Sequence, residues 1–312
     1  MKRLTLLLFA LPALAAIDGT VTNRTTGKPV AGATVSVVNL AQGMQPAATA
    51  KTGAGGAFSI DIGVTGPVLL QTTHGGISYS KMLQLGAPLS GVALDVYDVS
   101  SKPGQAAVAQ RMLLFEPGNE QLQVTEIFLF QNPGATTWRD PGKGTLRFYL
   151  PPAAQGAVKV NATAPHGMPL AREAEKAGGD VYKVDFPIKP GGETRIDVSY
   201  SVHYHAGGTF EGKLVTPAKV TRLFAPIGVT LEGEGVAAAG QDPNMKANIY
   251  TVAGETFKIS VSMPEATAGE SGPRFEPIMP RLYGRAPVIV ALAAAILLLG
   301  FVLLYRARPG GA

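Results

Sequence analysis

The chain lacks cysteine, contains one tryptophan, and is poor in charged and aromatic residues, which make up 16% and 7% of its 312 positions. Without cysteine it can form neither a disulfide framework nor a thiolate metal site or nucleophile. None of its histidines has a glutamate three positions later, so the zinc-binding pair of a metallocarboxypeptidase is missing. The Gly-x-Ser-x-Gly turn of many hydrolases is missing too. We therefore expect no enzymatic activity, no catalytic residues and no cofactor.

Positive charge is concentrated at the two ends of the chain. The formal net charge is +5, and Lys2, Arg3, Arg306 and Arg308 carry four of these charges, which leaves +1 for everything between them. Nucleic-acid binding needs several clustered cations that displace counterions. The nearly neutral middle of the chain therefore indicates no nucleic-acid partner.

Residues 1–15 have the pattern of a secretory signal peptide. Lys2 and Arg3 precede an apolar run from Leu4 to Leu14, and Ala13-Leu14-Ala15 resembles a cleavage site. A helix of that length reaches about 16 Å, roughly half of the hydrocarbon core of a bilayer. The run is too short for a membrane anchor, so we expect it to be removed after export.

Residues 286–305 are apolar and uncharged, and twenty helical residues span about 30 Å, the thickness of the hydrocarbon core. Tyr283 and Tyr305 stand at the edges, where aromatic rings prefer the headgroup level. We predict a single transmembrane helix at 286–305, followed by a cytoplasmic tail at 306–312. The preceding residues, 264–284, are rich in Pro, Glu and Gly without periodicity, which favours an extended stalk.

The membrane orientation follows from the signal peptide, because the charges around the helix are balanced. Arg281 and Arg285 precede the span, and Arg306 and Arg308 follow it, so the positive-inside rule does not decide. A cleaved signal places the mature N-terminus outside. We expect a single-pass protein of the plasma (inner) membrane with its N-terminal bulk outside the cytoplasm, periplasmic if the source is Gram-negative.

Residues 16–98 alternate between apolar and polar positions, which is typical of half-buried strands. The apolar rows are Ile17, Gly19 and Val21; Ala33, Val35 and Val37; Phe58, Ile60 and Ile62; and Val92, Leu94 and Val96. Turns rich in Gly and Pro separate them. Short strands at this spacing favour a β-sandwich.

The same stretch, from Ile17 to Asp98, resembles the carboxypeptidase regulatory-like domain. The matching positions are Ile17-x-Gly19-x-Val21, Thr26-Gly27-x-Pro29-Val30-x-Gly32-Ala33-x-Val35, Thr52, and Gly56-x-Phe58. The resemblance implies a transthyretin-like β-sandwich, an accessory module sometimes grouped with carbohydrate-binding-like folds. Family members often carry an acidic residue after the threonine, where this chain has Gly53. We expect Gly53 and Gly55 to supply positive φ angles in that turn.

A second β region is expected at 107–263, after a short polar linker at 99–106. Its predicted strands are 122–130, 145–150, 181–186, 194–204, 220–224, 227–231, 249–253 and 256–262. In strand 194–204 the apolar row is Ile196, Val198, Tyr200, Val202 and Tyr204, which predicts one buried and one solvated face. Residues 171–177 give the only hint of a helix, and a break at Gly207-Gly208 leaves open one large sandwich or two small ones.

The fold class is therefore all-β. We expect tandem β-sandwich domains, the first of them transthyretin (prealbumin)-like, on a Pro-rich stalk with one C-terminal transmembrane helix.

His203 and His205 are the candidates for a metal site. At i and i+2 of a strand both imidazoles project from one face, about 7 Å apart along the chain, and Glu211 after the turn could be a third ligand. Two solvated histidines on an exposed face explain the pattern as well, and two ligands rarely hold a metal tightly. We expect no metal site.

Trp138, the only tryptophan, lies in a loop rich in Gly and Pro. Such a side chain can stack on a sugar or anchor a protein, or it can fold back over the edge of a sandwich. We favour the second interpretation, because binding platforms generally use more than one aromatic residue.

Two functions remain. The first is a non-catalytic, membrane-anchored extracytoplasmic protein that acts as an interaction or structural module of the cell envelope, with other envelope proteins as partners. The alternative is a carbohydrate-binding envelope protein that binds a glycan through the regulatory-like domain or Trp138.

Overall fold

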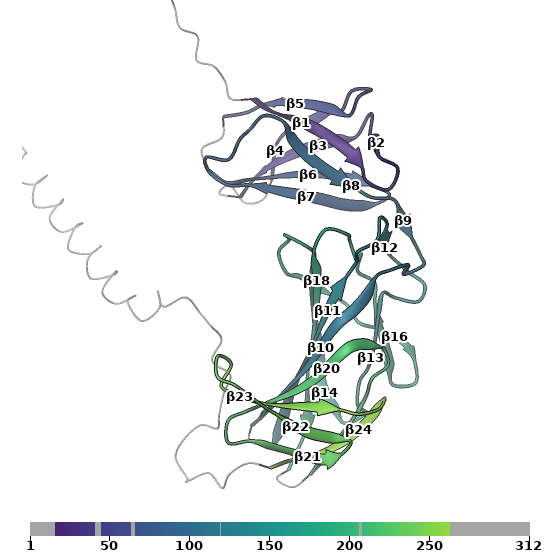
Figure 1. Ribbon diagram of the computed structural model, residues 1–312, viewed down its shortest axis with the longest axis vertical. Helices are drawn as coiled ribbons and strands as arrows, with labels where there is room; N and C mark the ends of the chain where they lie inside the picture. The colour runs from purple at the N-terminus through teal and green to yellow at the C-terminus, as the bar shows by residue number, and fades with distance from the viewer. Residues whose placement is uncertain (1–15, 41–44, 64–65, 119, 206–207, 263–312) are drawn as a thin grey trace, which may run out of the picture. The chain divides into compact units, whose positions relative to one another are not determined.

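The computed structural model describes residues 16–40, 45–63, 66–118, 120–205 and 208–262 (Figure 1). These residues are built from β-strands and belong to one compact unit of the chain. In this described part, no helix has the length and hydropathy needed to cross a membrane. The predicted signal peptide (1–15), stalk (264–284), transmembrane helix (286–305) and tail (306–312) lie outside the described residues.

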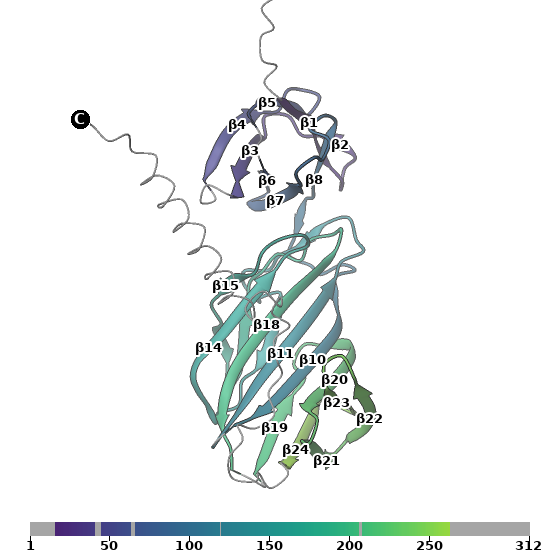
Figure 2. The same cartoon turned by 90° about the vertical axis from the view of Figure 1, so that its left-hand side faces the viewer.

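Residues 16–98 form two sheets that curve around one core (Figure 2). One sheet has the order β2-β1-β5 with β8 pairing β1 in parallel, and its strands are β1 (Ala16–Asn23), β2 (Lys28–Pro29), β5 (Ala57–Asp61) and β8 (Val92–Val96). The other has the order β4-β3-β6-β7, with strands β3 (Thr34–Asn39), β4 (Pro46–Lys51), β6 (Val68–His74) and β7 (Ile77–Leu83).

The alternation predicted for the first region is confirmed. Ile17 and Val21 of β1 are fully buried, and Gly19 between them lies against β8, where a Cβ would come within 2.0 Å of the Val92 carbonyl oxygen. A side chain cannot occupy that space. Glycine is therefore required at the point where β1 and β8 run closest.

The turn before β5 corrects one expectation. The positive φ angle falls on Gly56 (φ 74°) and not on Gly53 or Gly55. The Gly53 amide donates to the Ala57 carbonyl, and the Gly56 amide donates to the Gly53 carbonyl, both at 2.9 Å. This tight turn puts its last residue in the left-handed region, and a run of glycines in a sequence does not reveal which one closes the turn.

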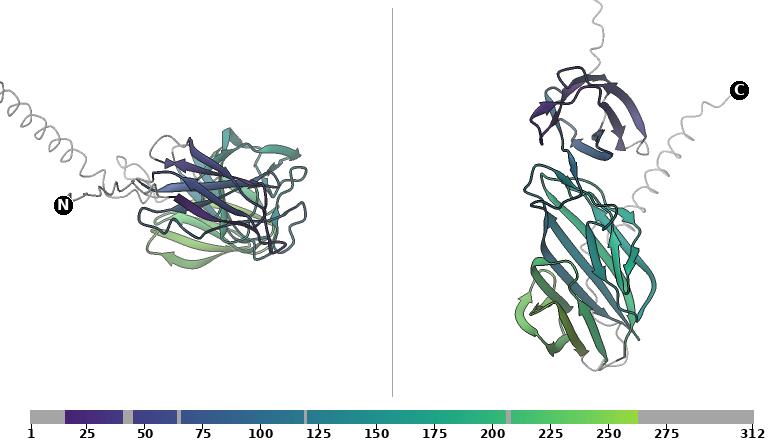
Figure 3. Two further views of the ribbon diagram at one scale, coloured as in Figure 1. Left: turned by 90° about the horizontal axis from the view of Figure 1, so that it is seen from above. Right: turned by 90° about the vertical axis from the view of Figure 1, so that its right-hand side faces the viewer.

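The second region, shown from a further side in Figure 3, contains one large sheet and two small ones. The large sheet has the order β15-β14-β18-β11-β10-β20-β23-β22, with β10 (Ala107–Pro117), β11 (Gln121–Gln131), β14 (Ala154–Thr163), β15 (Leu170–Arg172), β18 (Glu193–His203), β20 (Ala218–Pro226), β22 (Val236–Asp242) and β23 (Ala247–Val252). The small sheets are β13 (Leu146–Tyr149), β17 (Val181–Val184) and β16 (Glu175–Gly178), and β19 (Thr209–Lys213), β24 (Thr256–Ser262) and β21 (Thr230–Glu234).

The large sheet contains strands from both sides of the glycine pair that suggested a division. Strand β18 precedes Gly207-Gly208 and pairs with β11, while β20 follows it and pairs in parallel with β10. One core cluster runs from Ala106 to Val261. The described part of 107–263 therefore shares a single core.

The long strand predicted at 194–204 is confirmed as β18. Its predicted apolar row is buried, with every member at most 5% exposed: Ile196, Val198, Tyr200, Val202 and Tyr204. The hint of a helix at 171–177 is wrong, since this stretch contributes to β15 and β16. A helix of seven residues is too short to be stable alone, and here the backbone pairs with β14 and β17 instead.

Candidate functional site

The predicted linker takes part in β structure. Within it, β9 (Val99–Ser100) pairs in parallel with β12 (Thr137–Trp138). The Thr137 amide donates to the Asp98 carbonyl, and the Arg139 amide donates to the Ser100 carbonyl, both at 2.9 Å. Backbone hydrogen bonds thus join the end of the first region to the second, and we call this contact the junction.

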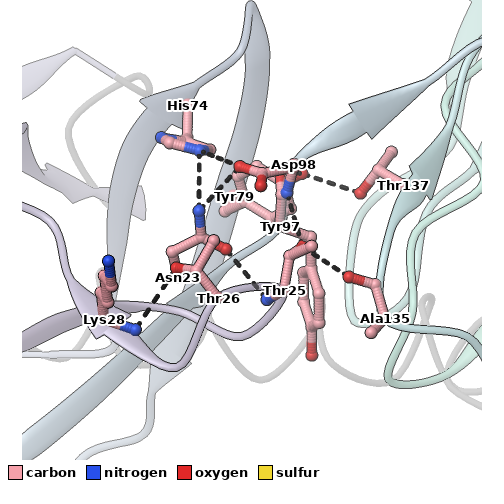
Figure 4. Close-up of polar contacts among 10 residues, drawn as sticks. All are labelled: Asn23, Thr25, Thr26, Lys28, His74, Tyr79, Tyr97, Asp98, Ala135 and Thr137. Carbon is pink, nitrogen blue, oxygen red and sulfur yellow. Dashed lines mark hydrogen bonds and ion pairs between the residues drawn. The ribbon is translucent and has the colours of Figure 1, made fainter.

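A network of polar side chains covers one side of the junction (Figure 4). The Asn23 amide donates to an Asp98 carboxylate oxygen at 2.7 Å, and His74 Nε2 lies 3.1 Å from the same oxygen. The hydrogen bond with His74, followed by that from Asn23, lowers the pKa of Asp98 below its ordinary value. The Thr25 hydroxyl accepts from the Asp98 amide at 2.8 Å and donates to the Ala135 carbonyl. These contacts join the turn at Thr25 to Asp98 and to the loop at Ala135. We therefore assign His74 and Asp98 a structural role.

Tyr79 crosses the junction in the interior. Its hydroxyl donates to the Tyr97 carbonyl at 2.9 Å and lies 2.8 Å from the Thr137 hydroxyl (Figure 4). Tyr79 is 4% exposed and Thr137 is fully buried. Burial is the main reason that the pKa of Tyr79 is raised. Because both hydroxyls are buried, water cannot replace these hydrogen bonds, and their loss would destabilise the junction.

A cavity of about 270 Å³ lies beside Tyr79. Its walls come from β7, from β8 and the residue after it, and from the loops that follow β14 and β17. The polar and aromatic side chains that line it are Tyr79, Lys81, Asp95, Tyr97, His166 and Lys189. Both regions contribute to the cavity, so it exists only when the junction is formed.

Lys189 is the titratable group in this cavity whose environment is most unusual. Its Nζ donates to the Ser78 carbonyl and lies 5.1 Å from the centroid of the Tyr79 ring. Burial lowers the pKa of Lys189 to about 8. Shifted pKa values in a cavity are typical of functional sites. Sequence reasoning missed this residue, because no motif surrounds it and its partners are more than a hundred positions away in the sequence.

The core of the second region contains a buried polar cluster. The Arg111 guanidinium donates to Glu126 and lies 4.9 Å from the centroid of the Phe128 ring. The Tyr200 hydroxyl donates to Glu126 at 2.9 Å. Burial, followed by the charge of Glu126, raises the pKa of Tyr200 well above its ordinary value. Arg111, Glu126 and Tyr200 are each at most 3% exposed, so we assign this cluster to the structure of the core.

The predicted metal candidates do not form a closed ligand set. The ring centroids of His203 and His205 are 4.4 Å apart. Glu211 is instead paired with Lys258 at 2.9 Å, which lowers the pKa of Glu211. Nowhere in the described part of the chain do three or more His, Asp or Glu side chains gather in a way that could hold a metal ion.

Trp138 packs inward. Its ring centroid is 6.3 Å from that of Phe130, and its backbone pairs with Ile188 on one side and Ser100 on the other. The side chain is half-buried against the large core. The indole thus packs against the core, and its Nε1 is buried.

Comparison with known proteins leaves the family open. No protein-family model matches the chain, and no curated protein matches it. Solved structures that align with it include the M1 zinc metallopeptidase from Deinococcus radiodurans, at 11% identity over 50% of this chain and 42% of that one, with a TM-score of 0.26. A mutant of this peptidase bound to a Tyr-Ser-Ala substrate aligns at 11% identity over 55% and 51%, with a TM-score of 0.29. The chain spans about half the length of these structures, and similarity at this level carries no argument about fold or activity.

Proposed function

We propose that this protein is a non-catalytic, membrane-anchored module of the cell envelope that binds another envelope protein through the surface around the junction. The sequence supports the anchoring, through the signal peptide at 1–15 and the apolar segment at 286–305. The two sheets of residues 16–98 support a transthyretin-like sandwich as the first module.

Exposed apolar side chains near the junction cavity carry this proposal. A neighbouring depression is lined by Met82, Gln84 and His166 among others. Leu85 directly follows Gln84 and is 72% exposed, while Met168 and Leu170 shortly after His166 are 44% and 50% exposed. Soluble surfaces rarely gather large apolar side chains around hollows unless another molecule covers them. Trp138 is packed inward, which favours a protein partner over a glycan.

Site-specific photo-cross-linking in native membranes tests the proposed surface. A photoreactive amino acid at Leu85 or Leu170 should give a discrete cross-linked product. The same residue at Ile227, which directly follows β20, is apolar and 52% exposed and lines neither the cavity nor the neighbouring depression, is the matched control. Equal labelling at all three positions, or no product at Leu85 and Leu170, would contradict the proposal.

The anchoring is tested separately by protease treatment of spheroplasts. The β regions should be digested while a tag after Ala312 is protected. Survival of the β regions with loss of the tag would reverse the orientation.

A further inference from the structure

The junction cavity has a surplus of hydrogen-bond donors. Lys189 Nζ uses one of its three N–H groups on the Ser78 carbonyl, and Lys81 Nζ uses one on the Ala93 carbonyl at 3.1 Å. Neither amine has a carboxylate within ion-pair distance in the described part of the chain. Two lysines in one cavity without an acidic partner leave positive charge to be compensated.

The acidic residue of the cavity does not compensate this charge. Asp95 also lines the cavity, but its carboxylate is paired with Arg24 at 2.9 Å. The hydroxyl of Tyr97 adds a further donor beside Gly191, where a Cβ would come into van der Waals contact with it at 3.8 Å. The cavity thus contains two lysines and the Tyr97 phenol as donors, while its one acidic residue is already paired with Arg24.

The size of the cavity limits what it can hold. At about 270 Å³ it lies just below the range of about 300–1,000 Å³ that is typical of sites for drug-sized ligands. A single side chain or a small acid fits such a volume. The donors and the rings of Tyr79 and Tyr97 line the same cavity, which suits a short chain that ends in an anionic group.

We propose that the junction cavity binds a carboxylate, supplied either by a small aliphatic acid or by an acidic side chain of the docked partner. The carboxylate is held by Lys189 and Lys81, with Tyr97 as an additional donor, and its aliphatic stem packs on the tyrosine rings. This proposal deepens the function proposed above. An acidic side chain of the partner as the source rests on that function, whereas a small aliphatic acid as the source does not.

Lys189 shares the cavity with Lys81, Asp95, Tyr97 and His166, and we assign the pH dependence of binding between pH 7 and pH 9 to Lys189. Its pKa of about 8 in the free protein means that the amine is mostly charged at pH 7 and mostly neutral at pH 9. A carboxylate binds the charged amine, so the affinity at pH 9 is expected to be about tenfold lower than the affinity at pH 7. This test needs no substitution and does not depend on the folding of a variant.

Calorimetric titration of the full chain in detergent, with glutarate as the probe, tests the site. Glutarate should bind at pH 7, and glutaramide, which has the same shape without charge, should not. Lys189→Met should weaken glutarate binding at least tenfold and remove its pH dependence. Lys219→Met, at an exposed lysine on β20, is the matched control and should leave binding unchanged.

The source of the carboxylate is decided by two peptides. Binding of acetyl-Ala-Glu-Ala-amide but not acetyl-Ala-Gln-Ala-amide indicates a partner side chain, whereas binding of glutarate alone indicates a small acid. Equal binding of glutarate and glutaramide, equal binding of glutarate and inorganic phosphate, or full binding by Lys189→Met would overturn the proposal. Cross-linking at Leu85 is independent of these titrations, so the failure of the docking function and the failure of the carboxylate site can be told apart.

Discussion

The two β regions use the same alternating pattern but fill their cores differently. The first has a core of aliphatic residues with Phe58 and Tyr79, and none of its buried side chains in the described residues is charged. The second, with its eight-stranded sheet, has Phe115, Phe128 and Phe130 among its fully buried residues and also encloses Arg111 and Glu126. The larger core accommodates an ion pair in which Glu126 is bonded to Arg111 and Tyr200, while Nε and Nη1 of Arg111 have no hydrogen-bond partner among the described residues. The smaller core depends on close backbone packing at Gly19.

The largest expected effect comes from breaking the charged cluster of the second region. Glu126→Ala leaves Arg111 buried without its partner and removes the acceptor of Tyr200, so we expect a loss of about 3–5 kcal/mol in the free energy of unfolding. Urea unfolding of the detergent-solubilised chain measures it. The double variant Arg111→Met with Glu126→Leu should lose clearly less. Equal losses would show that the ion pair itself, and not an unpaired charge, determines stability.

The corresponding test in the first region is Gly19→Ala. The added Cβ would lie 2.0 Å from the Val92 carbonyl oxygen and 2.8 Å from the Phe58 ring, so β1 and β8 must separate. We expect a loss of about 1–3 kcal/mol in the unfolding of this region. Gly63, which has open space at the Cβ position, is the matched control, and Gly63→Ala should be close to neutral. A neutral Gly19→Ala would mean that the two strands can move apart freely.

The junction is tested by Tyr79→Phe, which removes one hydroxyl from between the regions. We expect a loss of about 1 kcal/mol and a separation of the unfolding transitions of the two regions. Trp138 lies in β12 at the junction, so its fluorescence reports on this contact while circular dichroism reports on the whole. Tyr182→Phe is the control, because Tyr182 packs on Phe148. Coincident transitions in both variants would show that this hydroxyl does not couple the regions.

The smallest expected effect is a pH dependence at Lys189. Its pKa in the folded protein is about 8, and in an unfolded chain it is about 10.4. Between these values the unfolded chain holds more protons, so stability from this group rises with pH, by about 1 kcal/mol. The comparison is between the native chain and Lys189→Met at pH 7.5 and pH 10. An identical change in both chains would place the pKa of Lys189 near its ordinary value.

Many strands could be predicted from the sequence because their alternation is local. Residues 256–262 are β24 as expected, and the buried row of β18 matches residue by residue. Strand β10 was not among the predictions, since Gln110 and Arg111 interrupt its apolar pattern. Arg111 is one partner of the buried ion pair with Glu126. The apolar pattern therefore fails at the position where the core contains a charged residue.

The candidate site could not be predicted in the same way. Ser78 and Lys189 are 111 positions apart, and Tyr79 and Thr137 are 58 apart. None of these residues lies in a recognisable sequence motif. The histidine pair and Trp138 attracted attention as sequence features, yet the structure places Glu211 in an ion pair with Lys258 and the indole against Phe130.

By itself the sequence determined the all-β class of the described residues, the placement of many strands, and which face of β18 is buried, because burial alternates with a period of two wherever a sheet has one solvated side. Only the tertiary structure decided that the predicted linker pairs with β12, that one sheet contains strands from both sides of the glycine pair, and that two lysines share one cavity. These features depend on contacts between distant segments, and such contacts leave no periodic trace in the sequence of either segment.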